Sequence, residues 1–345
     1  MPEVPRNIPE VLGLDIGGAN LKAASAAGQA VTLPFPLWKQ PEKLAGGLME
    51  LLVRLPHRGP VAITMTGELC DCFASKAAGV RHILTAVQEV FPEGPVFVWR
   101  NDAKWAGLQH AMEDPLPVAS ANWLASATFA ARYLPQGAGW FFDLGSTTLD
   151  LIPLADGKVT SVSKTDLDRL QAGELAYLGA SRTPVCSLVT YVDVNRKKLS
   201  VATEWFASLD DVLLVLDQAT EDLHDKNTAD GQPRTRACAR KRVARMVCAE
   251  PDELGSDALH AICREVLAAY HERLHELLLR PFAQQNRWGG VILSGSGEHL
   301  LANVLHRLDL EARPLISLSQ QLGPDLSTAL AAYAVATLLA ERQAR

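Results

Sequence analysis

The sequence has few features of a secreted, membrane-spanning or nucleic-acid-binding chain. Its six cysteines include no Cys-x-x-Cys pair, so a disulfide framework is not expected and the thiols should be reduced. The longest uncharged segments, Pro115–Ala131 and Leu326–Ala340, fall short of the roughly 20 strongly apolar residues that cross a bilayer. The opening MPEVPRNIPE lacks the apolar run of a secretory signal. We therefore expect a cytoplasmic protein with no membrane partner.

Positive charge is not in excess either. The 33 Lys and Arg residues against 39 Asp and Glu residues give a net charge of −6, which argues against nucleic acid as a partner. The chain is 48% hydrophobic and 21% charged, as is usual for a globular protein with a sizeable core. Its 345 residues suggest about two domains.

The most informative feature that is present is a repeat. Residues 11–28 read VLGLDIGGANLKAASAAG, and residues 139–157 read GWFFDLGSTTLDLIPLADG. An offset of 128 residues carries Asp15 onto Asp143 and Gly17 onto Gly145. Each copy predicts two strands joined by a tight glycine turn, with the Asp at the end of the first strand. Two copies in one register indicate a duplication rather than two unrelated hairpins.

The turns of this repeat suit phosphate binding. Glycine lets backbone amides approach an anion closely, small polar side chains can add hydrogen bonds, and Asp15 and Asp143 can hold Mg²⁺ through water. A third glycine turn, Gly295–Gly297, follows an apolar run and precedes a helix-like segment, which also favours anions. The predicted phosphate-binding residues are Gly17, Gly18, Asn20, Lys22, Gly145, Ser146, Thr147, Thr148, Gly295, Ser296 and Gly297.

Hydrophobic periodicity places strands and helices in alternation, which predicts an α/β fold. We expect strands near 11–16, 20–26, 29–34, 61–65, 95–99, 290–294 and 314–317, and helices over 41–55, 76–90, 297–309 and 325–342. The segment from about 165 to 288 is expected to be a mostly helical insertion in the second half of the chain. Its strongest helix, over 259–280, carries one apolar stripe.

Strings along most of the chain resemble a known family. The two Asp-x-Gly hairpins and the Ser-Gly-Ser-Gly turn resemble the actin-like ATPase (ASKHA) superfamily. Within it, the strings resemble the hydantoinase/oxoprolinase-related branch linked to tetrahydromethanopterin one-carbon metabolism. They are Gly13–Lys22, Thr66–Leu69, Asn101–Gly107, Ala119–Trp123, Asp143–Thr148, Gly173–Glu174, Arg182–Cys186, Thr228–Gly231 and Arg242–Met246. The resemblance implies two RNase H-like lobes of the actin/Hsp70 type around a central cleft, residues 1–135 and 136–345.

The same resemblance implies a reaction. The branch includes an archaeal synthase of methanofuran biosynthesis, which joins an aminomethylfuran-methyl diphosphate to the phenol of γ-glutamyltyramine and releases diphosphate. The chain is therefore expected to be a transferase that uses Mg²⁺ and a small phosphorylated substrate. A homodimer is one of the oligomeric states that the sequence leaves open.

Residue types suggest roles in such a reaction. The negative charge of the leaving diphosphate has to be neutralised, which suits Mg²⁺ on Asp15 and Asp143 together with basic side chains. The phenol loses its proton as it attacks, so a buried carboxylate is needed as general base, although each candidate carboxylate could equally cap a turn or helix. The catalytic candidates are Glu68, Asp71, Asp102 and Lys104.

Substrate contacts are expected at strand ends and from the resembling strings. Asn101 follows the apolar run 96–99, at a position where open α/β sheets bind ligands, and Trp105 or Trp123 could stack on a furan or phenol ring unless it is a core residue. The substrate-binding candidates are Asn101, Trp105, Glu174, Arg182, Asp230, Arg242 and Arg245.

Three other features compete for a role. His271-Glu272-Arg-Leu-His275 matches the HExxH zinc pattern, but a solvated helix face is favoured because no clear third ligand follows. Six of the twelve residues from Arg234 to Arg245 are basic, which fits either a solvated helix face or a clamp for diphosphate or glutamyl carboxylates. Cys70 and Cys72 are interpreted as buried thiols rather than as a metal or redox pair.

Two further function classes stay open. Three phosphate-facing turns would serve ATP as well as an organic diphosphate, so an ATP-dependent small-molecule kinase or amide hydrolase is the alternative, with ATP as its cofactor. A non-enzymatic actin-like scaffold is a weaker interpretation.

Overall fold

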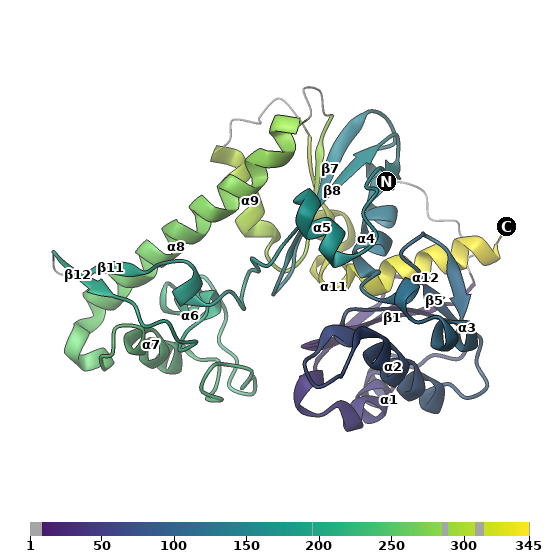
Figure 1. Ribbon diagram of the computed structural model, residues 1–345, viewed down its shortest axis with the longest axis horizontal. Helices are drawn as coiled ribbons and strands as arrows, with labels where there is room; N and C mark the ends of the chain where they lie inside the picture. The colour runs from purple at the N-terminus through teal and green to yellow at the C-terminus, as the bar shows by residue number, and fades with distance from the viewer. Residues whose placement is uncertain (1–8, 195, 285–288, 308–313, 345) are drawn as a thin grey trace.

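Two mixed β-sheets with helices packed on their faces form the main body of the molecule (Figure 1). The computed structural model describes residues 9–194, 196–284, 289–307 and 314–344. The first sheet has the order β3-β2-β1-β4-β5-β6. Its strands are β1 (Leu12–Ile16), β2 (Asn20–Ser25), β3 (Ala30–Pro34), β4 (Val61–Met65), β5 (Val96–Trp99) and β6 (Trp105–Gly107).

The second sheet repeats this plan with the order β10-β8-β7-β13-β14, and β9 also pairs with β8. Its strands are β7 (Ala138–Leu144), β8 (Leu149–Ala155), β9 (Lys158–Val159), β10 (Leu175–Ala176), β13 (Val291–Ser294) and β14 (Leu315–Ser317). In both sheets an antiparallel hairpin is followed by a parallel strand, β1 beside β4 and β7 beside β13. The chain therefore has the duplicated RNase H-like, actin-type architecture that the hairpin repeat predicted.

The duplication extends to single hydrogen bonds. In the first hairpin the amide of Gly17 donates to the carbonyl of Asn20 over 3.0 Å, and in the second the amide of Gly145 donates to the carbonyl of Thr148 over 2.9 Å. A Cβ on Gly17 would lie 2.9 Å from that Asn20 oxygen, which is why the first turn requires glycine. The repeat in the sequence is thus a repeat of turn geometry.

Helices cover the first sheet on both faces. α1 (Leu44–Arg54) and α2 (Lys76–Val90), the latter capped by the hydroxyl of Ser75, bury one face with apolar residues at helical spacing. α4 (Asn122–Ala130) and α12 (Leu330–Gln343) pack together between the two sheets. A Cβ on Gly13 of β1 would lie 1.9 Å from the carbonyl oxygen of Ala332, so α12 lies directly on this strand.

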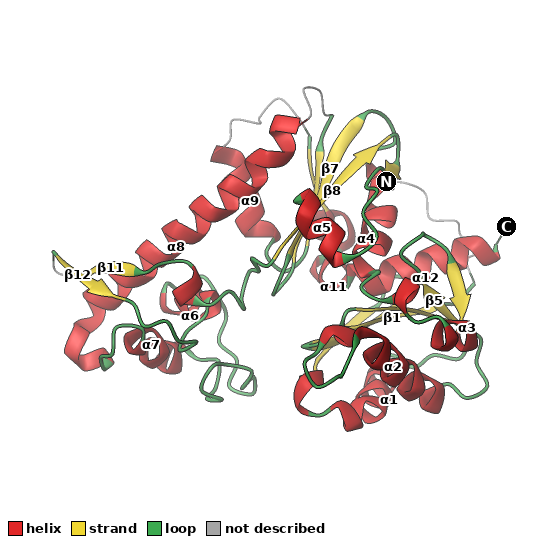
Figure 2. Ribbon diagram, in the orientation of Figure 1, coloured by secondary structure: helices red, strands yellow, loops and turns green. Residues whose placement is uncertain are grey.

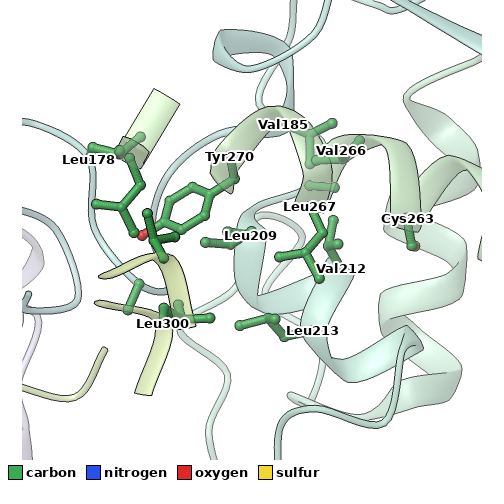
Figure 3. Close-up of a cluster of buried hydrophobic side chains, with 14 of the residues drawn as sticks. Leu178, Val185, Leu209, Val212, Leu213, Cys263, Val266, Leu267, Tyr270 and Leu300 are labelled. Carbon is green, nitrogen blue, oxygen red and sulfur yellow. The ribbon is translucent and has the colours of Figure 1, made fainter. Parts of the chain in front are cut away.

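The segment between β9 and β13 carries further helices and a small hairpin, and Figure 2 shows long loops between them. Its helices are α5 (Asp166–Ala172), α6 (Leu209–Val215), α7 (Arg236–Arg245) and α8 (Pro251–Gln284), and the hairpin is β11 (Tyr191–Val194) with β12 (Lys197–Ser200). The predicted apolar stripe of α8 is confirmed. Val266, Leu267 and Tyr270 lie against Leu209, Val212 and Leu213 of α6 (Figure 3).

The remaining helices are α3 (Leu108–Glu113), α9 (Glu298–Arg307), α10 (Leu318–Leu322) and α11 (Pro324–Thr328). Most predicted elements are present, although residues 308–309 of the helix expected over 297–309 lie outside the described residues. Two other predicted helices differ from the structure. The helix expected over 41–55 begins at Leu44, because the residues before it form a 3₁₀ turn, and the helix expected over 325–342 is divided at Ala329. No helix in the described part of the chain is long and apolar enough to cross a membrane.

Candidate active site

Two aspartates occupy equivalent positions at the ends of the paired hairpins. In the first sheet Asp15 lies between Lys22 on β2 and Thr64 on β4. In the second sheet Asp143 lies between Asp150 on β8 and Ser294 on β13. The register therefore gives each lobe a row of three polar side chains across neighbouring strands.

The two rows face each other, and their charges interact. The charges of both Lys22 and Asp15, from the first lobe, act on the carboxyl of Asp143 in the second. Burial, and then the charge of Asp150, raise the pKa of Asp143 to about 7. Burial also raises the pKa of Asp15, against the charge of Lys22, whose Nζ lies 3.9 Å from the carboxylate. Two carboxylates that resist ionisation at one place favour a bound cation.

Sequence reasoning missed a second group of charges beside Asp143. Asp150 forms an ion pair with Arg169, whose guanidinium lies 4.5 Å from the ring centroid of Trp123 and 3.2 Å from Asp166. Arg169 is held there by α5, which begins with a capping box between Thr165 and Asp168. The repeat contained the signal for Asp150, because the same offset of 128 residues carries Lys22 onto it.

The tight turns that follow Asp15 and Asp143 present free amides. Within the described residues, the backbone amides of Gly18, Ala19, Ser146 and Thr147 donate no hydrogen bond. Their carbonyls are engaged instead. Ser146 accepts bonds from the amides of Ser181 and Arg182, and Gly18 accepts one from Leu37. The turns are therefore fixed through their carbonyls, and their amide N–H groups remain free to donate, which suits a phosphate group.

The third glycine turn differs from the other two. The amide of Gly297 donates to the carbonyl of Leu144, and that of Glu298 donates to the carbonyl of Gly295. Gly295 has φ +91°, and a Cβ there would lie 2.5 Å from a carboxylate oxygen of Asp143. This turn packs directly against Asp143, while Ser296 is exposed.

Glu68 is a second buried carboxylate beside the first turn, in addition to Asp15. The residue before it, Gly67, packs on the backbone of Ile16 and Gly17, and Glu68 is 1% exposed. One carboxylate oxygen accepts a hydrogen bond of 2.6 Å from Ser120, and the other has no partner among the described residues. Burial raises the pKa of Glu68 to about 7, although the Ser120 bond opposes the rise. This pKa suits a general base at neutral pH.

The other acid–base candidates lie elsewhere. Arg100 binds Asp102 through two hydrogen bonds, and Lys104, 76% exposed on its side chain, lies 3.6 Å from the same carboxylate. Partial burial acts to raise the pKa of Asp102, but Arg100 and Lys104 hold it below its ordinary value. Asp71 is exposed. The geometry therefore favours Glu68 over Asp71 and Asp102 as the base.

The aromatic and amide candidates are parts of the framework. Trp105 packs edge-on against Trp99 at 4.9 Å, and Trp123 is 2% exposed. The backbone N–H of Asn101 donates to the carbonyl of Pro117 and fixes the loop after β5. Tyr177, which sequence reasoning did not single out, is 62% exposed, and the charges of both Glu68 and Asp150 act on its phenol group.

Most substrate candidates beyond residue 170 have internal partners. Glu174 accepts a hydrogen bond of 2.6 Å from Ser161 and lines a cavity of about 510 Å³ formed with residues of β7, β8, α5 and α8. Arg242 is fully buried and donates to Asp211 over 2.8 Å and to Asp230 over 3.0 Å, while Arg245 lies 3.8 Å from Asp230. Arg182 is different, because its side chain crosses to the first lobe and lies 4.9 Å from the ring centroid of Trp38.

The basic segment from Arg234 to Arg245 is thus partly structural. Arg234 makes a two-pronged contact with Asp210 at 2.6 and 2.7 Å, and Arg242 makes the buried pairs already described. Neither arginine is a solvated side chain or a free anion ligand. Sequence patterns did not reveal this because the acidic partners lie on α6 and in the loop before α7.

The remaining motifs are the two histidines on α8 and the neighbouring pair Cys70 and Cys72. In the described ranges, no group of three or more His, Cys, Asp or Glu residues is arranged to hold a metal ion. His271 and His275 are therefore not part of such a group. Burial raises the pKa of Cys70 to about 11, so it is a thiol at neutral pH. Cys72 is exposed and unbridged, which differs from the buried thiol that we expected.

The residues at the ends of β1 and β7 do fit Mg²⁺. This ion is commonly held by one or two carboxylates together with water and substrate phosphates, so Asp15 and Asp143 are enough protein ligands. One oxygen of Asp15 is buried and has no partner in the described part of the chain. Such an atom, in a carboxyl whose charged form is destabilised by burial, would gain a partner from a bound cation.

Comparison with known proteins finds matches along most of the chain. A model of the hydantoinase/oxoprolinase family matches residues 60–336. The chain is 32% identical over 332 residues to a protein of Methanocaldococcus jannaschii, (4-{4-[2-(gamma-L-glutamylamino)ethyl]phenoxymethyl}furan-2-yl)methanamine synthase, across 95% of this chain and 97% of that one. A synthase of the same name from Methanococcus vannielii is 33% identical over 201 residues, 57% of this chain and 88% of the relative.

Among solved structures, nucleotide-free acetone carboxylase aligns with a TM-score of 0.54 and 10% sequence identity, over 95% of this chain and 70% of that one. At this identity the likeness supports the fold alone. Together with the sequence matches, it agrees with the duplicated architecture seen in the two sheets.

Proposed function

The chain belongs to the hydantoinase/oxoprolinase family, and from this premise we propose that it is a transferase of methanofuran-type cofactor biosynthesis. It joins an aminomethylfuran-methyl diphosphate to the phenol of γ-glutamyltyramine through an ether bond and releases diphosphate. The name of these relatives describes a product with such a phenoxymethyl-furan ether.

One observation carries the proposal on the structural side. The two glycine turns with their free amides directly follow Asp15 and Asp143, the charge of Asp15 acts on Asp143 across the lobes, and Glu68 lies beside the first turn. The turn amides and the two aspartates suit a leaving diphosphate, and Glu68 suits an attacking phenol, which has to lose its proton. A kinase or hydrolase would use the same turns for ATP, which is why the test below includes ATP.

The reaction follows from these positions. The bond between the furfuryl carbon and the diphosphate oxygen breaks, and both of its electrons leave with the diphosphate. The phenol oxygen forms the new bond to carbon, and its proton passes to Glu68. The furan oxygen delocalises positive charge onto the ring, so the protein mainly stabilises the leaving group and positions the phenol.

Each group has a stated part in this step. Bound Mg²⁺ would neutralise charge that develops on the diphosphate oxygens. Asp15 and Asp143 would hold that ion, the amides of Gly18, Ala19, Ser146 and Thr147 would bind phosphate oxygens, and Lys22 balances the charge of Asp15. Ser120 orients the carboxyl group of Glu68 through its hydrogen bond.

The proposal predicts a strict substrate requirement. With Mg²⁺ and both organic substrates, the protein should form ether product and diphosphate in equal amounts, measured by mass spectrometry and a coupled diphosphate assay. Omitting the phenol should abolish diphosphate release, and added ATP should not be consumed. Phenol-stimulated ATP hydrolysis without ether product would support the kinase or hydrolase alternative instead.

A further inference from the structure

Arg182 and Trp38 lie where the two phosphate-facing turns approach each other. The amide of Arg182 donates to the carbonyl of Ser146 in the second turn over 2.9 Å. The amide of Leu37, next to Trp38, donates to the carbonyl of Gly18 in the first turn, also over 2.9 Å. Each residue is thus attached to one turn by the backbone.

Their side chains meet between the lobes. The guanidinium carbon of Arg182 lies 4.9 Å from the centroid of the Trp38 ring, within the range of a cation–π contact. Cys70, whose sulfur would be 3.0 Å from a Cβ on Gly18, is close enough for its charge state to affect Arg182. The contact therefore lies over the first turn while its arginine comes from the second.

The guanidinium of Arg182 has no anionic partner. Within the described residues, it forms no ion pair and donates no side-chain hydrogen bond, although it is partly buried. Other buried or partly buried arginines are paired: Arg169 with Asp150, Arg234 with Asp210, and Arg242 with Asp211. A half-buried and unpaired guanidinium beside two anion-binding turns is suited to bind an anion that arrives from solution.

We propose that Arg182 binds the diphosphate group together with the two turns, and that Trp38 positions the guanidinium of Arg182 for this contact. Lys22 already neutralises Asp15, whereas Arg182 has no carboxylate partner among the described residues and is therefore available for the substrate. The planar guanidinium can contact two phosphate oxygens at once, and stacking on Trp38 reduces the rotamer freedom that would be lost on binding. This inference rests on the proposed function, since it names the part of that substrate which Arg182 contacts.

The arrangement has a consequence for the lobes. Trp38 belongs to the first lobe and Arg182 to the second, so a diphosphate that engages both turns and Arg182 is bound by both lobes together. Release of diphosphate after the reaction then requires these contacts to break as a unit.

The test is calorimetric binding of inorganic diphosphate with Mg²⁺ to the full chain. Arg182→Ala should bind about 10- to 100-fold more weakly than wild type, as expected for loss of a hydrogen-bonded charge pair. Arg182→Lys should fall between them, because it keeps the charge but loses the planar fork. Trp38→Leu should weaken binding severalfold with a smaller effect on kcat than on KM for the diphosphate substrate. The controls Arg264→Ala and Trp205→Leu change exposed residues away from both turns and should bind as wild type does.

Unchanged diphosphate affinity in folded Arg182→Ala would overturn the proposal. If that variant does not fold, wild-type affinity in both Arg182→Lys and Trp38→Leu would overturn it equally. The binding measurement involves no turnover, so it is separate from the ether assay. A wild-type protein that binds diphosphate through Arg182 but makes no ether would leave this inference standing and remove the proposed reaction.

Discussion

Glu68→Gln is expected to lower turnover by about 100- to 10,000-fold, the usual contribution of a general base. Glutamine keeps the shape of the side chain and can still accept the hydrogen bond from Ser120, but it cannot take the phenol proton. KM for the diphosphate substrate should change little, because the carboxyl group contacts the acceptor and not the phosphates. The measurement is the initial rate of diphosphate release at saturating substrates.

The pH profile gives the same residue a second signature. Because the pKa of Glu68 is raised to about 7, wild-type kcat/KM should increase with pH up to a plateau just above neutrality. Glu68→Gln should lose this rise and keep only a weak dependence from other groups. A variant that retained the wild-type profile would contradict the role of Glu68, while Glu276→Gln, at an exposed position on α8, should match wild type throughout.

Stability should change in the opposite direction to activity. The folded-state pKa of Glu68 lies above its unfolded value of about 4.5, so its favourable contribution is complete below that value and is lost as the pH rises through about 7. Well above pH 7, Glu68→Gln should therefore be more stable than wild type by about 3 kcal/mol, and near pH 4.5 the difference should vanish. Urea unfolding at the two pH values measures this.

The second large effect concerns the paired aspartates. Asp15→Asn and Asp143→Asn should each lower turnover at least 100-fold, the scale of losing one preorganised contact to a developing charge. The concentration of Mg²⁺ that gives half-maximal activity should increase in both. Since burial already raises the pKa of both carboxyls, their replacement by neutral amides should not lower the melting temperature near neutral pH.

The matched control is Asp257→Asn, an exposed change on α8. It should leave turnover and the Mg²⁺ titration unaltered. If either Asp15→Asn or Asp143→Asn keeps more than about a tenth of wild-type turnover, a loss of less than about 1.4 kcal/mol, the aspartates do not hold the ion.

The fold could be predicted well because its signal is local and occurs twice. An Asp at the end of an apolar run, a glycine turn and an alternating strand fix a hairpin within about fifteen residues, and the second copy at residue 143 confirmed the interpretation. Short elements were less visible. β6 has three residues and β9 and β10 have two each, too few to show any periodicity.

The site could be predicted only where its residues belong to the repeat. Asp15, Asp143 and the turn glycines come from the motif itself, and Glu68 came from a neighbouring string. Its partner Ser120 lies 52 residues away along the chain, and Arg182 meets Trp38 from another lobe. Pairing of this kind depends on how the sheets and loops pack together, and a local sequence pattern does not predict that packing.

Burial also separates residues that look alike in the sequence. Arg182 and Arg242 each begin one of the strings that resemble the family, yet Arg242 is enclosed by Asp211 and Asp230 while Arg182 has no carboxylate partner in the described ranges. Asp102 and Glu68 both follow strands of the first sheet, yet Asp102 is paired with Arg100 while Glu68 accepts a hydrogen bond from the neutral hydroxyl of Ser120. The chemistry of each residue follows from its partners.

The central claim, carbon–oxygen bond formation with diphosphate as the leaving group, is tested most directly with an acceptor whose phenol oxygen is ¹⁸O. The purified protein is incubated with Mg²⁺, the aminomethylfuran-methyl diphosphate and this labelled γ-glutamyltyramine, and the masses of the products are measured by mass spectrometry. We predict that all of the label is retained in the ether and that the diphosphate carries none. Label in a phosphorylated phenol, or an ether that lacks ¹⁸O, would contradict the account.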